Sequence, residues 1–213
     1  MISNKDRSGY IGASDTKYVV GNWKTKTFEK WWWKKIGIDT TSIENESTKA
    51  GNNYEHKIID ALNIPDIEYD KQIIKGRIRV NLDSNTPTKI HEIKTYKYSN
   101  GFDIKKHKDY REQVQVQMYI SEIHSAEIDA YGLLPEDYKN YFNEIDLDRL
   151  EAFEIEYDED WILNEYKPKA DYLCDCLEKG KFPSEEEYNE QFKNCWRVYW
   201  GNERPRKWWN RLR

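Results

Sequence analysis

This sequence of 213 residues has few of the features that assign a protein to a class at once. It contains no run of 18 apolar residues, so we expect no transmembrane helix. Its first residues, MISNKDRSGY, are polar and lack an apolar stretch, so we expect no secretion signal and a cytoplasmic location. Three cysteines, Cys174, Cys176 and Cys195, predict reduced thiols and are too few for a usual zinc or iron–sulfur site.

Aromatic residues compensate for a low hydrophobic content. Only 38% of the residues are hydrophobic, but nine are Trp and sixteen are Tyr. Each large aromatic side chain can bury about 150–250 Å², so core packing is the ordinary interpretation of each one. The length fits a single domain, which we assign to residues 1–213, with a basic Trp/Arg-rich tail at about 193–213.

The net charge of −5 is unevenly distributed. Residues 1–111 contain 21 basic and 15 acidic residues, residues 112–192 contain 6 and 23, and residues 193–213 contain 7 and 1. A polyanion would therefore be steered toward the two ends of the sequence and away from its middle. The acidic middle also fits the solvated faces of ordinary helices.

Hydrophobic periodicity predicts helices first and a hairpin after them. Residues 27–36 and 48–62 have helical spacing, and Ile78, Val80 and Leu82 alternate with polar residues as in a strand that ends at Asp83. Residues 83–88 predict a turn, and residues 89–96 predict the second strand of the hairpin.

The remainder alternates between helix and strand. We expect a helix or two over 103–123, a strand over 126–134, one or two strands within 141–157, and helices over 158–177 and 184–199. This order predicts an α/β fold in which helices flank a small mixed sheet.

The chemistry centres on Asp83 and the tripeptide Glu92-Ile93-Lys94. Residues 92 and 94 are two apart on a strand, so their side chains leave the same face, near Asp83 at the end of the preceding strand. Two carboxylates suit Mg²⁺, with Mn²⁺ as a substitute, and the carbonyl of Ile93 is a further candidate ligand. Metal-assisted phosphodiester hydrolysis uses such a site, and Lys94 could stabilise developing negative charge. The alternative is an exposed strand with alternating charges.

Further motifs surround this pattern in a set order. The segments are RSGYIGASD at 7–15, GNNYE at 51–55, the hairpin at 83–94, and YREQVQVQ at 110–117. Together they resemble the PD-(D/E)XK nucleases, and more narrowly the lambda-exonuclease-like, YqaJ-type phage recombination nucleases. The fold implied is a restriction-endonuclease-like core. The chain departs from the family at Leu82-Asp83, where Pro-Asp is common.

The resemblance implies a role for each matching residue. Asp83 and Glu92 would bind the metal directly, and Glu55 would bind it directly or through water. Lys94 would activate or orient the attacking water, and Gln113 would position that water or Lys94. Arg7 and Ser14 would grip a 5′-terminal phosphate. A guanidinium fork and a helix N-terminus are both suited to phosphate.

Two aromatic segments have open interpretations. Trp31, Trp32 and Trp33 cannot all face one side of a helix, so at least one must be exposed or lie at an interface. The tail interleaves Trp and Arg, which fits stacking on single-stranded DNA. A helix that docks on a partner fits the tail equally well.

These observations predict a magnesium-dependent deoxyribonuclease of a phage or prophage recombination system. It would digest one strand of linear duplex DNA from its 5′ end and leave a 3′ overhang for a single-strand annealing protein. The resemblance also implies a ring-shaped homotrimer. The alternatives are a structure-specific or restriction-type endonuclease, and a non-catalytic DNA-binding or assembly protein of the same fold.

Overall fold

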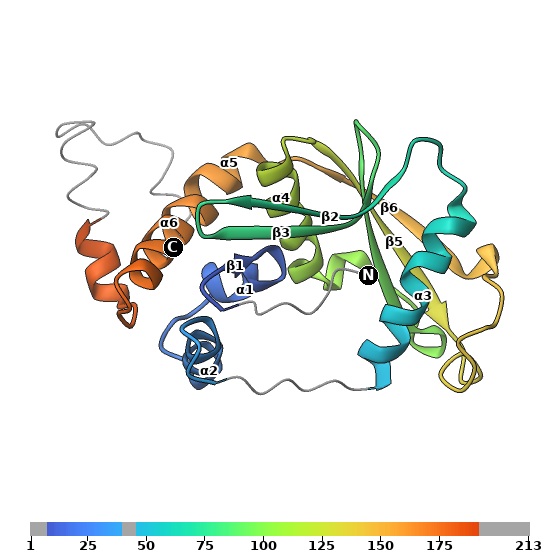
Figure 1. Cartoon of the computed structure of the whole chain (residues 1–213), viewed down its shortest axis with the longest axis horizontal. Coiled ribbons are helices and arrows are strands. Elements are labelled where there is room, and N and C mark those ends of the chain that lie inside the picture. The colour runs from blue at the N-terminus through green and yellow to red at the C-terminus, as the bar shows by residue number, and fades with distance from the viewer. Residues whose placement is uncertain (1–7, 40–45, 192–213) are drawn as a thin grey trace.

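A six-stranded mixed sheet forms the centre of the part of the chain that the computed structural model describes, residues 8–39 and 46–191 (Figure 1). Five strands follow the order β1-β3-β4-β5-β6, and β2 pairs with β3 beside this path. The strands are β1 (Ile11–Gly12), β2 (Glu68–Lys75), β3 (Ile78–Asn85), β4 (Ile90–Lys97), β5 (Ser125–Leu133) and β6 (Leu150–Glu156). The expected α/β fold with a small mixed sheet is confirmed.

Helix α4 (Lys108–Ser121) makes the crossover between two parallel strands. Strands β4 and β5 pair in parallel over their length, from Ile90↔Ala126 to Lys97↔Leu133. Two neighbouring parallel strands need such a crossover, because the end of the first strand and the start of the second lie at opposite edges of the sheet. The pairs β2–β3, β3–β4 and β5–β6 are antiparallel, and β1 pairs with β3 in parallel.

One face of the sheet packs against α4 and the N-terminal helices. The larger core cluster joins Leu82, Ile90 and Ile128 of the strands to Val114 and Met118 of α4. It also takes in α1 (Thr16–Val19), α2 (Lys26–Lys35), η5 (Ile162–Tyr166) and α6 (Lys167–Glu178). The short α5 (Glu159–Trp161) leads into η5.

Helix α3 (Glu46–Leu62) covers the other face. Tyr54, Ile58 and Ile59 of α3 pack on Ile93 and Tyr131, which point away from α4 because successive strand residues alternate between faces. Strand β4 is therefore covered on both faces. Alternate side chains along it point toward α4 and toward α3.

The tryptophan run of α2 divides between core and solvent. Trp32 is fully buried, Trp31 is 6% exposed, and Trp33 is 39% exposed. The helix begins where the Thr25 side chain accepts a hydrogen bond from the Phe28 amide, 3.1 Å away. This confirms that the three rings do not share one side.

The β3–β4 hairpin is longer than the sequence predicts. We expected a turn over 83–88, but β3 continues through Ser84 and Asn85, which pair with His91 and Ile90. The turn lies at Thr86–Lys89, where the Thr86 amide donates to the Lys89 carbonyl at 2.8 Å. Ser84 and Asn85 are buried in the strand, although their composition favours turns.

Three further expectations are settled in part. A single strand, β6, stands in the region 141–157. The segment 103–123 divides into η3 (Ile104–Lys106) and α4. Helical structure begins again at 185 and runs to 191, and the predicted tail lies outside the described residues. None of the helices in the described ranges is long and apolar enough to cross a membrane.

Candidate metal centre

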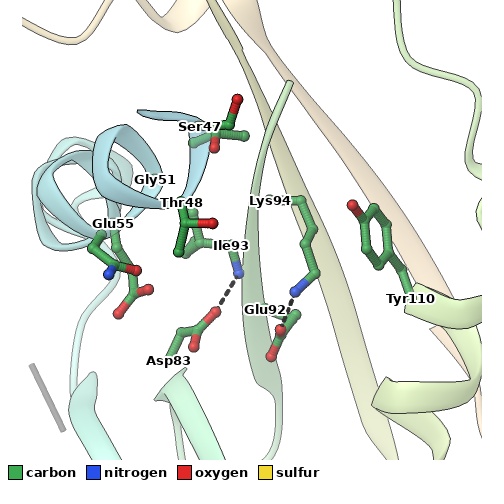
Figure 2. Close-up of a pocket in the computed structure, with 11 residues that line it drawn as sticks. Ser47, Thr48, Gly51, Glu55, Asp83, Glu92, Ile93, Lys94 and Tyr110 are labelled. Carbon is green, nitrogen blue, oxygen red and sulfur yellow. Dashed lines mark hydrogen bonds and ion pairs between the residues drawn. The ribbon is translucent and has the colours of Figure 1, made fainter. Parts of the chain in front are cut away.

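The site forms where β3 and β4 part. Within the described residues these strands are paired at Ser84↔His91 and Asn85↔Ile90, and no pairing continues to Asp83 and Glu92. Backbone groups at such a gap need other partners. The Ile93 amide donates to Asp83 Oδ2 at 2.9 Å, so a side chain takes the place of the missing strand bond (Figure 2).

Three elements bring acidic side chains to this gap. Asp83 comes from β3, Glu92 from β4 and Glu55 from α3, and all three line one cavity of about 350 Å³ (Figure 2). Gly51, one helical turn before Glu55, lies close to β4: a Cβ built there would be 3.1 Å from Thr95 Oγ1. A glycine therefore lets the helix approach the strand at this edge of the cavity.

Glu92 is held by donors from two sides. Its side chain is 2% exposed, and its Oε1 accepts from Lys94 Nζ at 2.5 Å and from the Gln113 amide. Its Oε2 accepts from Gln117 Nε2 at 2.5 Å. Both glutamines come from α4, where a spacing of four residues places them on one face.

Lys94 brings a positive charge to the site. Its Nζ lies 3.5 Å from Gln113 Oε1 and 4.9 Å from the centre of the Tyr110 ring, and Figure 2 shows it turned toward Glu92. Burial lowers the pKa of Lys94, but Glu92 and Asp83 outweigh that effect and raise the pKa overall. Lys94 is therefore charged at neutral pH.

The carboxylates disfavour one another's charge. Burial raises the pKa of Asp83 well above its usual value, and the charges of Glu92 and Glu55 add to the increase. Burial also raises the pKa of Glu55, and Glu92 adds to it. Among the residues that line the cavity, three acidic groups face Lys94, so acidic groups outnumber basic ones there. A divalent cation with a preference for oxygen ligands fits this set: Asp83, Glu92 and Glu55 would hold it.

Of the two residues expected at a 5′ phosphate, the structure describes Ser14, which does not line this cavity. Ser14 is exposed on the three-residue η1 (Ala13–Asp15), and it is not among the residues that line the metal cavity. Its neighbour Asp15 is tied to Lys35 at 2.5 Å and to the indole N–H of Trp31 at 2.8 Å. Arg7 lies outside the described residues.

Comparison with solved structures identifies the fold. The alkaline exonuclease LHK-Exo from Laribacter hongkongensis matches 90% of this chain and 96% of its own, with 18% identity and a TM-score of 0.61. The chain has the fold of these exonucleases. LHK-Exo in complex with dAMP matches over the same shares with 19% identity and a TM-score of 0.61.

A phage-related exonuclease from Haemophilus somnus shares the exonuclease fold over 87% of this chain and 96% of its own, with 17% identity and a TM-score of 0.54. No family model matches the sequence, and no curated protein sequence does so. The resemblance to lambda-exonuclease-like nucleases is thus confirmed in the fold.

Among the described residues, two groups of three His, Asp or Glu side chains place ligand atoms within 4.8 Å of one another, and neither contains Asp83 or Glu92. One comprises Glu55, His56 and Asp70, and the other comprises His91, Glu127 and Asp129. Asp129 is fully buried and its Oδ2 lies 3.0 Å from His91 Nδ1. Lys89 Nζ lies 3.2 Å from Glu127, so the positive charge of a lysine already lies beside this second group.

Gln117 is the site residue that sequence reasoning did not single out. It is fully buried and donates to both Glu92 and the carbonyl of Asn81. The signal was present in the sequence, because Gln117 stands four residues after Gln113 and on the same face of a helix.

Proposed function

We propose that this protein is a magnesium-dependent deoxyribonuclease that digests one strand of linear duplex DNA from its 5′ end. The observation that carries the proposal is the convergence of Glu55, Asp83, Glu92 and Lys94 on one cavity, in a chain with the exonuclease fold. A binding protein has no need of three mutually repelling carboxylates around a half-buried lysine. LHK-Exo in complex with dAMP supports DNA as the substrate class.

The residues of the cavity divide the work. Magnesium, when bound, would lower the pKa of a water molecule and neutralise charge on the scissile phosphate. Asp83 and Glu92 bind the ion, Glu55 binds it directly or through water, and the Ile93 carbonyl is a candidate ligand. Lys94 orients the attacking water and stabilises the charge that develops on the phosphate oxygens. Gln113 accepts from Lys94 Nζ and so limits its position.

End recognition is assigned to Arg7 and Ser14. A terminal phosphate carries nearly two negative charges at neutral pH and an internal phosphodiester carries one, so a guanidinium discriminates between them. Each cut exposes a new 5′ phosphate, and the same contacts can then draw the strand forward. The 3′ overhang would serve a single-strand annealing protein in the cytoplasm of a phage-infected or lysogenic bacterium. A homotrimeric ring around the DNA completes the proposal.

The test compares three substrates with and without Mg²⁺: linear duplex with a 5′ phosphate, the same duplex with a 5′ hydroxyl, and closed circular DNA. Asp83→Asn and Glu92→Gln should abolish digestion, whereas Asp171→Asn, an exposed carboxylate on α6, should not. Arg7→Ala should slow digestion of the phosphorylated end most.

Cutting of closed circles would favour an endonuclease. Absence of any cutting by the wild type would favour a non-catalytic protein. Light scattering in solution tests the trimer.

A further inference from the structure

Gln117 occupies the point where β3, β4 and α4 meet. Its Nε2 donates to the Asn81 carbonyl of β3 at 3.0 Å and to Glu92 Oε2 of β4 at 2.5 Å. The side chain is fully buried in α4. One amide group therefore uses both of its N–H donors to join the two strands where their own pairing stops.

The type of residue matters because of charge. An amide fixes a carboxylate without adding a positive charge, so Glu92 is oriented while the site keeps its attraction for a cation. Lys94 also binds Glu92, but it cancels part of that attraction.

The two oxygens of Glu92 are not equivalent in this arrangement. Oε1 receives two donors, Lys94 Nζ and the Gln113 amide, and Oε2 receives one, from Gln117. A carboxylate oxygen has two lone pairs. Both lone pairs of Oε1 are therefore used, whereas Oε2 keeps one.

We propose that Gln117 is a positioning residue that presents Glu92 Oε2 to the catalytic cation. This inference rests on the proposed function. It adds the residue that orients Glu92 and the Glu92 oxygen that would bind the ion. Partners that orient a metal ligand through hydrogen bonds usually change metal affinity by about 10- to 100-fold when they are removed.

The test is direct binding of Mn²⁺ to the full chain without DNA, measured by calorimetry. Gln117→Met keeps the length of the side chain and removes its hydrogen bonds, and we expect it to weaken Mn²⁺ binding about tenfold or more. The rate of digestion should recover at saturating Mg²⁺, because the ion is bound less tightly but in the same place.

The matched control is Gln115→Met on the same helix. Gln115 also makes two hydrogen bonds, to the Glu156 carbonyl at 2.6 Å and from the Asp158 amide at 2.8 Å, and it does not contact Glu92. We expect this variant to melt at a lower temperature and to bind Mn²⁺ as the wild type does. Equal loss of affinity in both variants, or normal affinity in Gln117→Met, overturns the inference.

Two further outcomes separate this inference from the proposed function. If the wild type digests DNA, Asp83→Asn does not, and Gln117→Met binds Mn²⁺ normally, the inference alone fails. If Gln117→Met weakens Mn²⁺ binding but the wild type cuts no DNA, the nuclease proposal alone fails. A crystal structure of the wild type with Mn²⁺ bound through Glu92 Oε1 rather than Oε2 also contradicts the inference, whether or not the variants fold.

Discussion

Lys94 is placed to act on the reaction rather than on DNA binding, because its charge is enclosed among Glu92, Gln113 and Tyr110. We predict that Lys94→Ala lowers the rate of digestion by about 10²-fold or more, a usual scale for loss of one electrostatic stabiliser. DNA affinity should change little. The control is Lys97→Ala, an exposed lysine on the same strand. Affinity that falls as far as the rate would mean that Lys94 is a DNA clamp.

Asp83 should destabilise the protein when no metal is bound. Burial and the neighbouring carboxylates raise its pKa, so ionisation in the folded state is unfavourable. The destabilisation should be absent at pH values below the usual Asp pKa of about 4, and it should grow as pH rises through the raised pKa.

We therefore predict that Asp83→Asn melts at a higher temperature than the wild type at pH 8 in EDTA. The difference should disappear near pH 3. For a chain of this size each kcal/mol corresponds to about 2–4 °C. Added Mg²⁺ should raise the melting temperature of the wild type and leave that of the variant unchanged. A variant that is less stable than the wild type at pH 8 would contradict this account.

The sequence was informative about these residues because their spacing carries the chemistry. Asp83, Glu92 and Lys94 lie on adjacent strands at a fixed interval, and the flanking motifs added Glu55 and Gln113. All five lie at or beside one cavity, and their roles stay predictions. Gln117 was missed because a buried glutamine on a helix looks like any other polar residue until its partners are known.

At the scale of elements, a buried ion pair fixes the segment between β5 and β6. Arg149 donates to Asp137 at 2.6 Å and to the Gly132 carbonyl at 3.2 Å, and it lies 4.7 Å over the Tyr131 ring. Asp137 also accepts from the Leu134 amide at 2.8 Å. This segment packs against α3, which carries Glu55. The Arg149–Asp137 pair therefore helps to hold that helix at the site.

We predict that Arg149→Met destabilises the fold by about 3–5 kcal/mol, because it leaves a carboxylate buried without its partner. Lys167→Met, which breaks an exposed pair with Asp171, should change stability by about 0.5 kcal/mol or less. Urea denaturation measures both. If the two variants lose equal stability, the pair does not support this segment.

The same pair has a pH signature. Burial raises the pKa of Asp137, but the hydrogen bonds from Asn143, Leu134 and Arg149 outweigh it and lower the pKa overall. Its contribution should therefore be complete above the usual Asp pKa of about 4 and be lost as pH falls through the lowered value. In Asp137→Asn that part of the acid sensitivity should be absent.

Element boundaries were predicted well where periodicity was strong and less well where polar residues are buried. The alternation of Ile78, Val80 and Leu82 predicted β3, but Ser84 and Asn85 resemble turn residues and in fact extend the strand. The gap between β3 and β4 could not be predicted, because it depends on the side chains of Asp83 and Gln117 replacing strand bonds.

At the scale of the whole molecule, the basic tail should contribute to DNA binding. Deletion of residues 204–213 removes five basic residues and two Trp. We predict weaker DNA binding, a shallower dependence of affinity on salt because fewer counterions are released, and unchanged Mn²⁺ binding. Binding at several salt concentrations measures this. An unchanged slope with weaker capture of an annealing protein would make the tail a protein-docking segment, and no change in either would make it a plain terminus.

The sheet is also two halves that are weakly joined. Strands β1–β3 and β4–β6 meet through two residue pairs, within the part of the chain that the structure describes. Local opening follows the weakest join, and amide hydrogen exchange detects it. The Ile93 amide is closed by Asp83 and not by a strand, so its proton should exchange faster in Asp83→Ala, while the Ile128 amide in the centre of β5 should not change. Exchange of the Ile93 amide proton would then report, without any substrate, whether strands β1–β3 stay joined to strands β4–β6 beside the site.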